Sequence, residues 1–539
     1  MSRWADLLKI RPGEGRMASL VIGLMVLTSA GFSLGSTGVE ALFFARFGVQ
    51  YLPFLYMGLA VLTGLTSLAI TAMLGRLPRT RLYLALPVAM AVVLVAARAL
   101  LLLDLPGAYP GLWLGKEVLN ALMGLFCWGV AGAVCDTRQA KRLFPLFGAG
   151  RILGAVLGGF GTGPLVAVLG TENLLLLWAG ALLAAFGLTR ALLGAPAVAL
   201  AAPRRQPRPA SLAVEMQRGF QFVRRSPLMG WIAVAAVLFS ILYFSIALPF
   251  AKTMAAQFPD EAELAGFLGL FNGLSTAAAF LASLILANRL YARFGLMVML
   301  LAFPILYLAG FAWLALAASF PAIVAFRFAQ MVWLAGLADA AYQALFNAVP
   351  AERRDQVRAF ISGGPEQAGT LIAGVVLWVG EQAFAPAQLY LVGLAAAAVT
   401  AFSLWRASRA YRGALLEALR AGQPSLFFSE EEPFGGFRRD AAAVAVAQRG
   451  LTDANAAVRR VSAEILGHLQ KRGHPAAAQV TAALVAALDD PVGEVRRAVL
   501  CALSRANAAS ALLAVAARLR DPEPEVRLQA VETLRSLAG

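Results

Sequence analysis

Charged side chains stand inside long apolar segments of this sequence, where an ionised group is costly and therefore points to a binding site or to an ion pair. Four of them are cations that together would attract an anion such as phosphate. An aromatic ring at Trp128 or Tyr243 could stack on a base. The residues predicted to bind a small molecule are Arg98, Lys116, Glu117, Trp128, Arg151, Arg327 and Asp339.

Two uses of these residues stay open. In the first, the cations contact an anionic ligand, and Glu117 or Asp339 takes up and releases a proton as its hydration changes. In the second, the charges only neutralise one another as ion pairs within the apolar region, for example Lys116 with a carboxylate.

A second charged group occupies turns between apolar segments. The segment 136–154 reads DTRQAKRLFPLFGAGRILG, with three cations and one carboxylate in its first seven residues. A similar turn follows at 353–358. These residues could form a gate that pairs when one side of the molecule closes, or they could only anchor the turns at a membrane surface. The predicted gate residues are Asp136, Arg138, Lys141, Arg142, Arg354, Asp355 and Arg358.

The composition shows which solvent surrounds these segments. The 539 residues are 60% hydrophobic and 14% charged, with a mean hydropathy of +0.72, whereas soluble domains carry about 25% charged residues. Lipid must therefore surround much of the chain. The net charge is +16, and the cations cluster in short loops between apolar segments. This clustering is typical of the cytoplasmic loops of membrane proteins and does not indicate a nucleic-acid partner.

Twelve apolar segments are close to the length that a bilayer of ~30 Å requires. They cover residues 17–44, 51–75, 82–103, 113–134, 145–169, 173–193, 228–250, 264–287, 296–317, 323–348, 360–379 and 388–405. Alternate loops are rich in arginine, and the loops between them lack lysine and arginine, with Arg46 as the exception. This pattern predicts a multi-pass protein of a bacterial inner membrane with both termini in the cytoplasm.

The membrane segments form two related halves. A linker rich in proline and arginine at 195–210 separates them, and an amphipathic helix follows at 211–225. At an offset of 216 residues, Arg138 corresponds to Arg354 and Phe144 to Phe360. We therefore expect an all-α, twelve-span bundle of two parallel six-helix halves, like that of major-facilitator carriers. The expected units are 1–194, 195–226, 227–410, 411–439 and 440–539.

The last unit contains an internal repeat. A motif of Leu-x-Asp followed by Val-Arg begins at Leu451, Leu488 and Leu519. Asp453, Asp490 and Asp521 each stand six residues before an arginine. Periods of 37 and 31 residues are typical of two-helix repeats, and the motif resembles HEAT repeats. We expect a cytoplasmic α-solenoid in which each Asp caps a helix and neutralises a stack of arginines, and which binds a protein partner or regulates the bundle.

The membrane part resembles the ATP/ADP carrier family of plastids and intracellular bacterial parasites. The resemblance rests on Trp128-Gly129, on 140–142 (AKR) and on 145–148 (PLFG). It implies exchange of nucleotides such as ATP and ADP by alternating access, with ATP among the bound ligands. Where nucleotide carriers of this family have a functional acidic residue in the fourth span, this sequence has Lys116, with Glu117 beside it.

Other functions find less support in the sequence. Gly148, Gly150, Gly154 and Gly158 follow helical spacing in an apolar segment, which favours close helix packing over a dinucleotide fingerprint. Three scattered cysteines and two histidines predict no metal site, and we expect no cofactor and no enzymatic activity. The remaining alternative to a carrier is a membrane-anchored scaffold that recruits a partner through its repeats.

Overall fold

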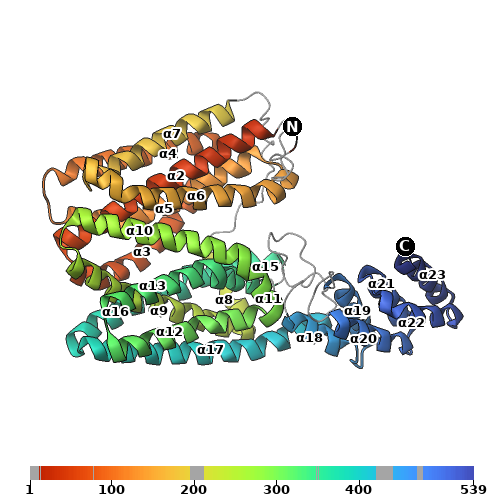
Figure 1. The fold of residues 1–539 in the computed structure, drawn as a ribbon. Coiled ribbons are helices and arrows are strands. Elements are labelled where there is room, and N and C mark those ends of the chain that lie inside the picture. Colours follow the sequence, from red (N-terminus) through yellow and green to blue (C-terminus); the bar gives the residue numbers. More distant parts are fainter. Residues whose placement is uncertain are drawn as a thin grey trace.

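The computed structural model describes residues 11, 14–76, 78–194, 212–346, 349, 351–420, 441–469 and 477–538. These residues form an all-helical fold in which two bundles lie side by side and the last helices extend from the second bundle (Figure 1). The predicted linker at 195–210 lies outside the described residues. The predicted linker at 411–439 lies only partly outside them, because helix α17 continues to Arg420.

The first bundle consists of six long helices. They are α2 (Gly15–Leu42), α3 (Leu52–Arg76), α4 (Arg79–Leu101), α5 (Ala108–Val134), α6 (Thr137–Leu169) and α7 (Leu174–Leu193), with η1 (Phe43–Phe47) and η2 (Val49–Tyr51) between α2 and α3. Gly48 and Gly170 end helical segments with φ values of 114° and 81°, which glycine adopts without steric cost. The chain therefore reverses direction between helices at glycines that tolerate a positive φ.

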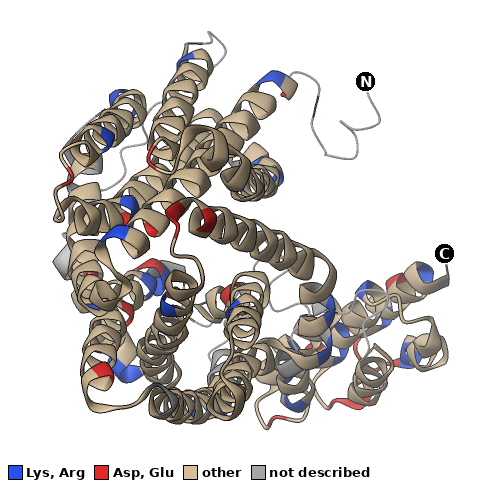
Figure 2. Ribbon diagram, turned by 60° about the vertical axis from the view of Figure 1, so that its left-hand side comes forward, with Lys and Arg blue, Asp and Glu red and all other residues tan. Residues whose placement is uncertain are grey.

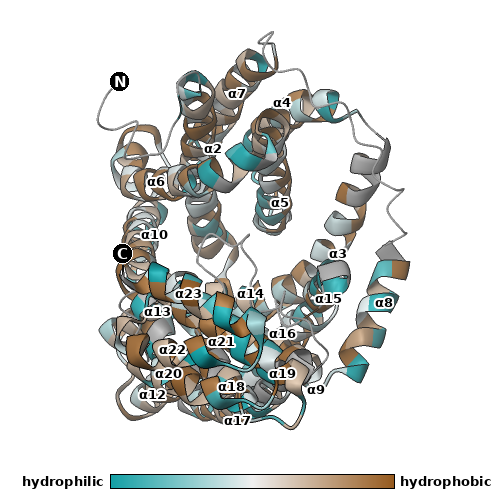
Figure 3. Ribbon diagram, turned by 90° about the vertical axis from the view of Figure 1, so that its right-hand side faces the viewer, coloured by the Kyte–Doolittle hydropathy of each residue, from teal (hydrophilic) through white to brown (hydrophobic). Residues whose placement is uncertain are grey.

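The second bundle has shorter and more interrupted helices. They are α8 (Leu212–Arg225), α9 (Pro227–Gln257), α10 (Glu261–Ala282), η3 (Ser283–Ala287), α11 (Asn288–Phe294), α12 (Leu296–Ala317), α13 (Phe320–Trp333), η4 (Leu334–Ala338), α14 (Asp339–Leu345), α15 (Ala351–Gly363), α16 (Pro365–Ala383) and α17 (Pro386–Arg420). Helix α8 is the predicted amphipathic helix, and Figure 3 shows hydrophilic and hydrophobic residues side by side along it.

Each of the twelve predicted spans overlaps a helical segment, but the predicted span 360–379 includes the break between α15 and α16. Among the described residues, eleven helices are long and apolar enough to cross a bilayer. Helix α16, with 19 residues and with Glu366 and Glu381 near its ends, is not among the eleven. The count of twelve spans therefore stays a prediction.

The two halves differ at the turn where their sequences correspond. In the first half, 137–169 form one continuous helix. In the second, Gly364 has φ −110° and ψ −81°, and Pro365 starts a new helix. A residue before proline is disfavoured in the α conformation, so the chain breaks into α15 and α16. The Gly364–Pro365 dipeptide thus makes the apolar helix α16 shorter than its counterpart α6.

The halves touch through closely packed helices. Helix α6 contacts α10, and α3 contacts α16. A Cβ atom added to Gly159 of α6 would lie 2.7 Å from the Cα of Gly273 and 2.8 Å from the carbonyl oxygen of Gly269 on α10. Within the first half, a Cβ at Gly154 would lie 2.3 Å from the carbonyl oxygen of Val26. The packing interpretation of this glycine series is confirmed at Gly154 and Gly158.

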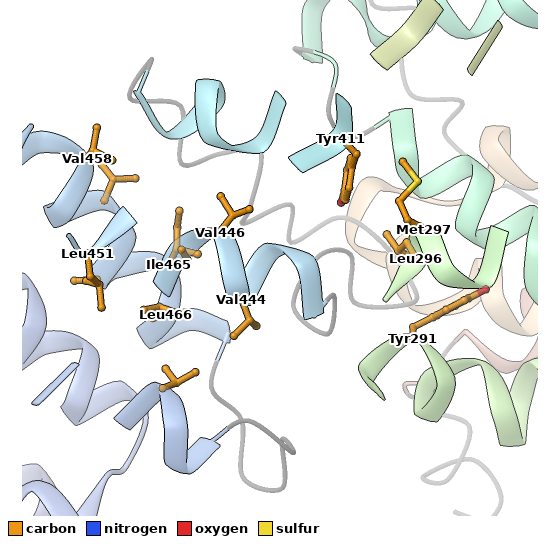
Figure 4. Close-up of a cluster of buried hydrophobic side chains, with 14 of the residues drawn as sticks. Tyr291, Leu296, Met297, Tyr411, Val444, Val446, Leu451, Val458, Ile465 and Leu466 are labelled. Carbon is orange, nitrogen blue, oxygen red and sulfur yellow. The ribbon is translucent and has the colours of Figure 1, made fainter. Parts of the chain in front are cut away.

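The last helices stack on one another, and the first of them pack against α11 and α17 of the second bundle. They are α18 (Ala441–Gly450), α19 (Ala456–Leu469), α20 (Ala477–Ala486), α21 (Gly493–Arg505), α22 (Leu512–Ala517) and α23 (Pro524–Ala538). We call them the repeat array. One buried apolar cluster joins it to the bundle and includes Met297 and Tyr411 as well as Val444 and Val446 of α18 (Figure 4).

Candidate functional site

A cavity of about 300 Å³ lies at the junction of the two halves. Helices α2 and α5 of the first half contribute Glu40, Lys116 and Glu117. Helices α10 and α13 of the second half contribute Asn272 and Arg327. The remaining lining is largely aromatic and aliphatic. Figure 2 shows charged residues concentrated toward helix ends, with few along the apolar lengths, so charges in this central cavity stand out.

Lys116 is the most enclosed charge on the first-half side. Its side chain is 5% exposed and its ammonium forms an ion pair with Glu40. Its Nζ also lies 3.6 Å from a carboxylate oxygen of Glu117 and 5.1 Å from the ring of Trp113. Two carboxylates therefore compensate one cation, and the ion-pair alternative holds for Lys116. Glu40, an ionisable residue inside the first predicted span but not one of the predicted binding residues, completes this group.

Arg327 stands opposite in a different setting. The residue is 8% exposed, and its Nη1 donates to the side-chain oxygen of Gln330 at 2.9 Å and approaches the carbonyl oxygen of Tyr243 at 3.5 Å. The guanidinium carbon lies 4.6 Å from the centroid of the Tyr243 ring. Among the described residues no carboxylate lies within ion-pair distance of Arg327, although Glu40 and Glu117 line the same cavity.

Asp339 lies in a neighbouring cavity of about 260 Å³ within the second half. Ser240, Tyr342 and Glu366 also line it, and the Tyr342 hydroxyl donates to Glu366 at 3.3 Å. Both cavities share Tyr243 and Phe244 in their linings. Asp339 directly follows the π-helical turn η4, a feature frequent at functional sites. The two cavities therefore adjoin, and the second contributes only carboxylates as charged groups.

Three predicted binding residues are placed apart from the linings of these two cavities. Arg98 donates to Asn173 at 2.9 Å and pairs with Glu172 at 2.9 Å, because the turn between α6 and α7 meets the last turn of α4. Arg151 is exposed on α6. Trp128 is 38% exposed and packs against Phe144 with ring centroids 5.5 Å apart.

Arg46 joins the halves at the end of the bundle far from the repeat array. Its guanidinium contacts Glu172 of the first half at 2.7 Å and Glu261 of the second half at 2.6 Å. Sequence analysis did not assign this contact. The signal was present, because Arg46 is the one cation that departs from the charge alternation of the loops. We call Arg46, Glu172 and Glu261 the outer bridge.

The predicted gate residues lie at the opposite end, and the contacts described for them stay within each half. Asp136 caps α6 through the amides of Arg138 and Gln139, and Arg138 is exposed. Arg142 pairs with Glu14 at 2.7 Å, and this hydrogen bond lowers the pKa of Glu14. The side chain of Lys141 lies outside the described residues.

The second-half members of the gate behave in the same way. On α15, the Arg358 guanidinium lies 5.3 Å from the Phe346 ring, Asp355 is exposed, and Arg354 is partly buried. The sequence places the two charged turns at the same end of the molecule. Whether they pair in another state remains a prediction.

The repeat array carries a ladder of charge pairs. Arg459 binds both carboxylate oxygens of Asp490, at 2.6 and 3.0 Å, and Arg496 binds those of Asp521, at 2.8 and 2.7 Å. Each arginine also donates to the backbone carbonyl of the aspartate six residues before it, as Arg496 does to Asp490 at 2.8 Å. The predicted neutralisation of stacked arginines is confirmed.

The predicted helix caps in the array are corrected. Asp490 accepts a hydrogen bond from the amide of Val492, and Val492 is itself the N-cap residue of α21. The aspartate therefore closes an Asx-type turn before the helix. Although burial alone would raise the pKa of Asp490, the hydrogen bonds from Arg459 and from the Val492 amide lower it overall.

Comparisons with known proteins agree with this architecture. Residues 112–337 match the family model described as TLC ATP/ADP transporter. The nucleoside transporter NupG is 16% identical, with a TM-score of 0.54 over 72% of this chain and 98% of that chain. A bacterial homologue of the iron transporter ferroportin in an inward-facing state is 16% identical, with a TM-score of 0.55 over 73% and 98%. No curated protein sequence matches the chain.

These similarities define the fold. The chain shares it with two solved membrane transporters. Among the described residues, eleven helices are long and apolar enough to cross a membrane, and the segment that matches the transporter-family model contains both Lys116 and Arg327.

Proposed function

We propose that the chain is an alternating-access transporter of an organic anion, with a nucleotide or related phosphorylated metabolite as its substrate. The observation that carries this proposal is Arg327, a nearly buried cation without a described carboxylate partner in a cavity between two halves. A buried charge is costly unless it is compensated. An anionic substrate supplies the missing charge.

The described contacts support an alternating-access cycle. The outer bridge ties the two halves together at one end. At the other end, Arg142 and Arg358 contact groups of their own halves. We propose that this arrangement is a state closed at the outer bridge. In the opposite state, the outer bridge separates and the predicted gate residues approach one another.

The choice of a nucleotide rests on the family segment. The match to the ATP/ADP transporter model covers residues 112–337 and so includes Lys116, Glu117 and Arg327 of the central cavity, but not Glu40 or Tyr56. The fold neighbour NupG is a nucleoside transporter, which adds support for a substrate of this kind. Aromatic groups such as Tyr56 and Tyr243 line the cavity.

The repeat array is proposed to be a HEAT-like module that regulates the carrier or binds a protein partner on the cytoplasmic side. Its support is the recurring arginine–aspartate ladder and the stacking of α19 on α21 and of α21 on α23. The proposed location is a bacterial inner membrane with both termini cytoplasmic. Labelling of single cysteines introduced at Arg138 and Arg354 from the same side tests this topology.

Counterflow in proteoliposomes tests transport itself. Vesicles loaded with one unlabelled phosphorylated compound at a time, from a panel that includes ATP, ADP and AMP, should accumulate the labelled form against its gradient. Absence of counterflow for every anion of the panel, together with tight capture of a cytoplasmic partner by the full chain, refutes the carrier and supports a scaffold.

A further inference from the structure

The charges around the central cavity define what kind of ligand it can hold. Its charged lining consists of two cations, Lys116 and Arg327, and two carboxylates, Glu40 and Glu117. The adjoining cavity adds Asp339 and Glu366 and no cation. The two linings together therefore hold two basic and four acidic side chains, a balance that disfavours a ligand with several negative charges.

The distribution of these charges is as informative as their sum. On the first-half side, Lys116 already pairs with Glu40 and lies close to Glu117. That group of three carries one net negative charge. Arg327 on the second-half side has only neutral partners among the described residues, Gln330 and Tyr243. The cavity thus has one positive pole and one negative side.

The size of the cavity limits the ligand further. A volume of about 300 Å³ is at the lower end of the range of ~300–1,000 Å³ that ligand pockets cover. Phe44, Tyr56 and Phe244 supply apolar walls, and Tyr243 already has the Arg327 guanidinium over its ring. A compact ligand with one anionic group and a flat or apolar body fits these walls.

We infer that this transporter accepts a nucleotide with a single phosphate and discriminates against nucleoside di- and triphosphates. This inference rests on the proposed function and narrows its substrate class. The phosphate binds Arg327, and N–H donors of the base face the carboxylates of Glu117 and Asp339. Each further phosphate would have to lie among uncompensated carboxylates, and like charges brought together in this way cost several kcal/mol.

The experiment compares AMP and ATP uptake by the full-length protein in proteoliposomes. AMP is expected to enter more than about tenfold faster than ATP, because every 1.4 kcal/mol of repulsion is tenfold. Arg327→Gln should remove most AMP uptake, and Arg327→Lys should restore part of it. Lys252→Gln is the matched control, because Lys252 is a cation that pairs with Glu381 outside both cavities.

A second variant keeps the test independent of overall folding. Glu117→Gln removes one negative charge from the cavity, so the ratio of AMP to ATP uptake within the same preparation should fall several-fold. ATP uptake as fast as AMP uptake in the wild-type protein, or an unchanged ratio in Glu117→Gln, overturns the inference and leaves the proposed function standing. Uptake of no phosphorylated compound overturns both.

Discussion

Asp521 gives a sharp test of what holds the repeat array together. Its side chain is 0% exposed and accepts two hydrogen bonds from Arg496, which is 7% exposed, and one from the amide of Glu523 at 3.1 Å. Asp521→Asn keeps the shape but removes the charge and one acceptor. The carboxylate that Arg496 then keeps is Glu523, which lies 3.4 Å away and is half exposed, beside its hydrogen bond to the backbone carbonyl of Asp490.

The expected cost follows from this geometry. Removing one partner of a buried ion pair destabilises by about 3–5 kcal/mol. The remaining contact with Glu523 places the value near the lower end, at about 3 kcal/mol. Helices α21 and α23 meet at this pair, so the loss falls on the local opening of these helices. Since 1.36 kcal/mol is tenfold, their amides should exchange with solvent about a hundredfold faster.

Hydrogen–deuterium exchange of the full-length protein measures this effect. Glu525→Gln is the matched control on the same helix, because the Glu525–Arg497 pair is largely exposed and such pairs contribute less than about 1 kcal/mol. If the α21 and α23 amides of Asp521→Asn exchange at the wild-type rate, or no faster than those of Glu525→Gln, the reasoning about the ladder is refuted.

Three further predictions address pH, packing and gating. Burial opposes it, but hydrogen bonds from Arg459 and Arg496 lower the pKa values of Asp490 and Asp521. The stability that these ion pairs contribute is present above the ordinary Asp pKa of about 4 and is lost as pH falls through the lower pKa values of the folded state. Thermal unfolding of the array should therefore depend on pH only in that acid range, and less so in Asp521→Asn. Gly159→Ala should reduce stability by about 1–3 kcal/mol through overpacking, as measured by thermal unfolding in detergent. Gly163→Ala, whose Cβ would lie 3.6 Å from the Cα of Gly266, should unfold like wild type. Equal stability of the two variants contradicts the close α6–α10 contact. In Arg46→Gln, a membrane-impermeant reagent added from the outside should label cysteines introduced into the cavity more strongly than in wild type. Glu381→Gln, which breaks an ion pair within one half, should not change this labelling. Unchanged labelling in Arg46→Gln excludes the outer bridge as a gate.

Much of the architecture could be predicted because lipid imposes simple rules. Apolar length located the helices, and the repeated Leu-x-Asp motif located the array, since both signals recur along the chain. The break at Gly364–Pro365 could have been recognised from the dipeptide, yet the correspondence with the first half favoured one continuous helix. The aspartate caps were misplaced because an Asx turn and an N-cap use the same residue type.

The site was only partly predictable for a different reason. Lys116, Glu117 and Arg327 could be found because charge within an apolar segment is rare. Their partners depend on how helices rotate and cross, which periodicity does not determine. Arg98 illustrates this, because the same signal selected it and the fold places it beside Glu172 instead. Trp128, predicted as a stacking face for a base, packs against Phe144.

The attachment of the repeat array to one half has a mechanical consequence. Tyr411, Val444 and Val446 belong to the same buried cluster as Tyr291 and Met297 of the second bundle. Any tilt of that bundle therefore moves the attached array with it, and the end of the array farthest from the bundle is displaced most. A fluorophore on α23, where Leu528 is 64% exposed, would turn each transport cycle into an optical signal.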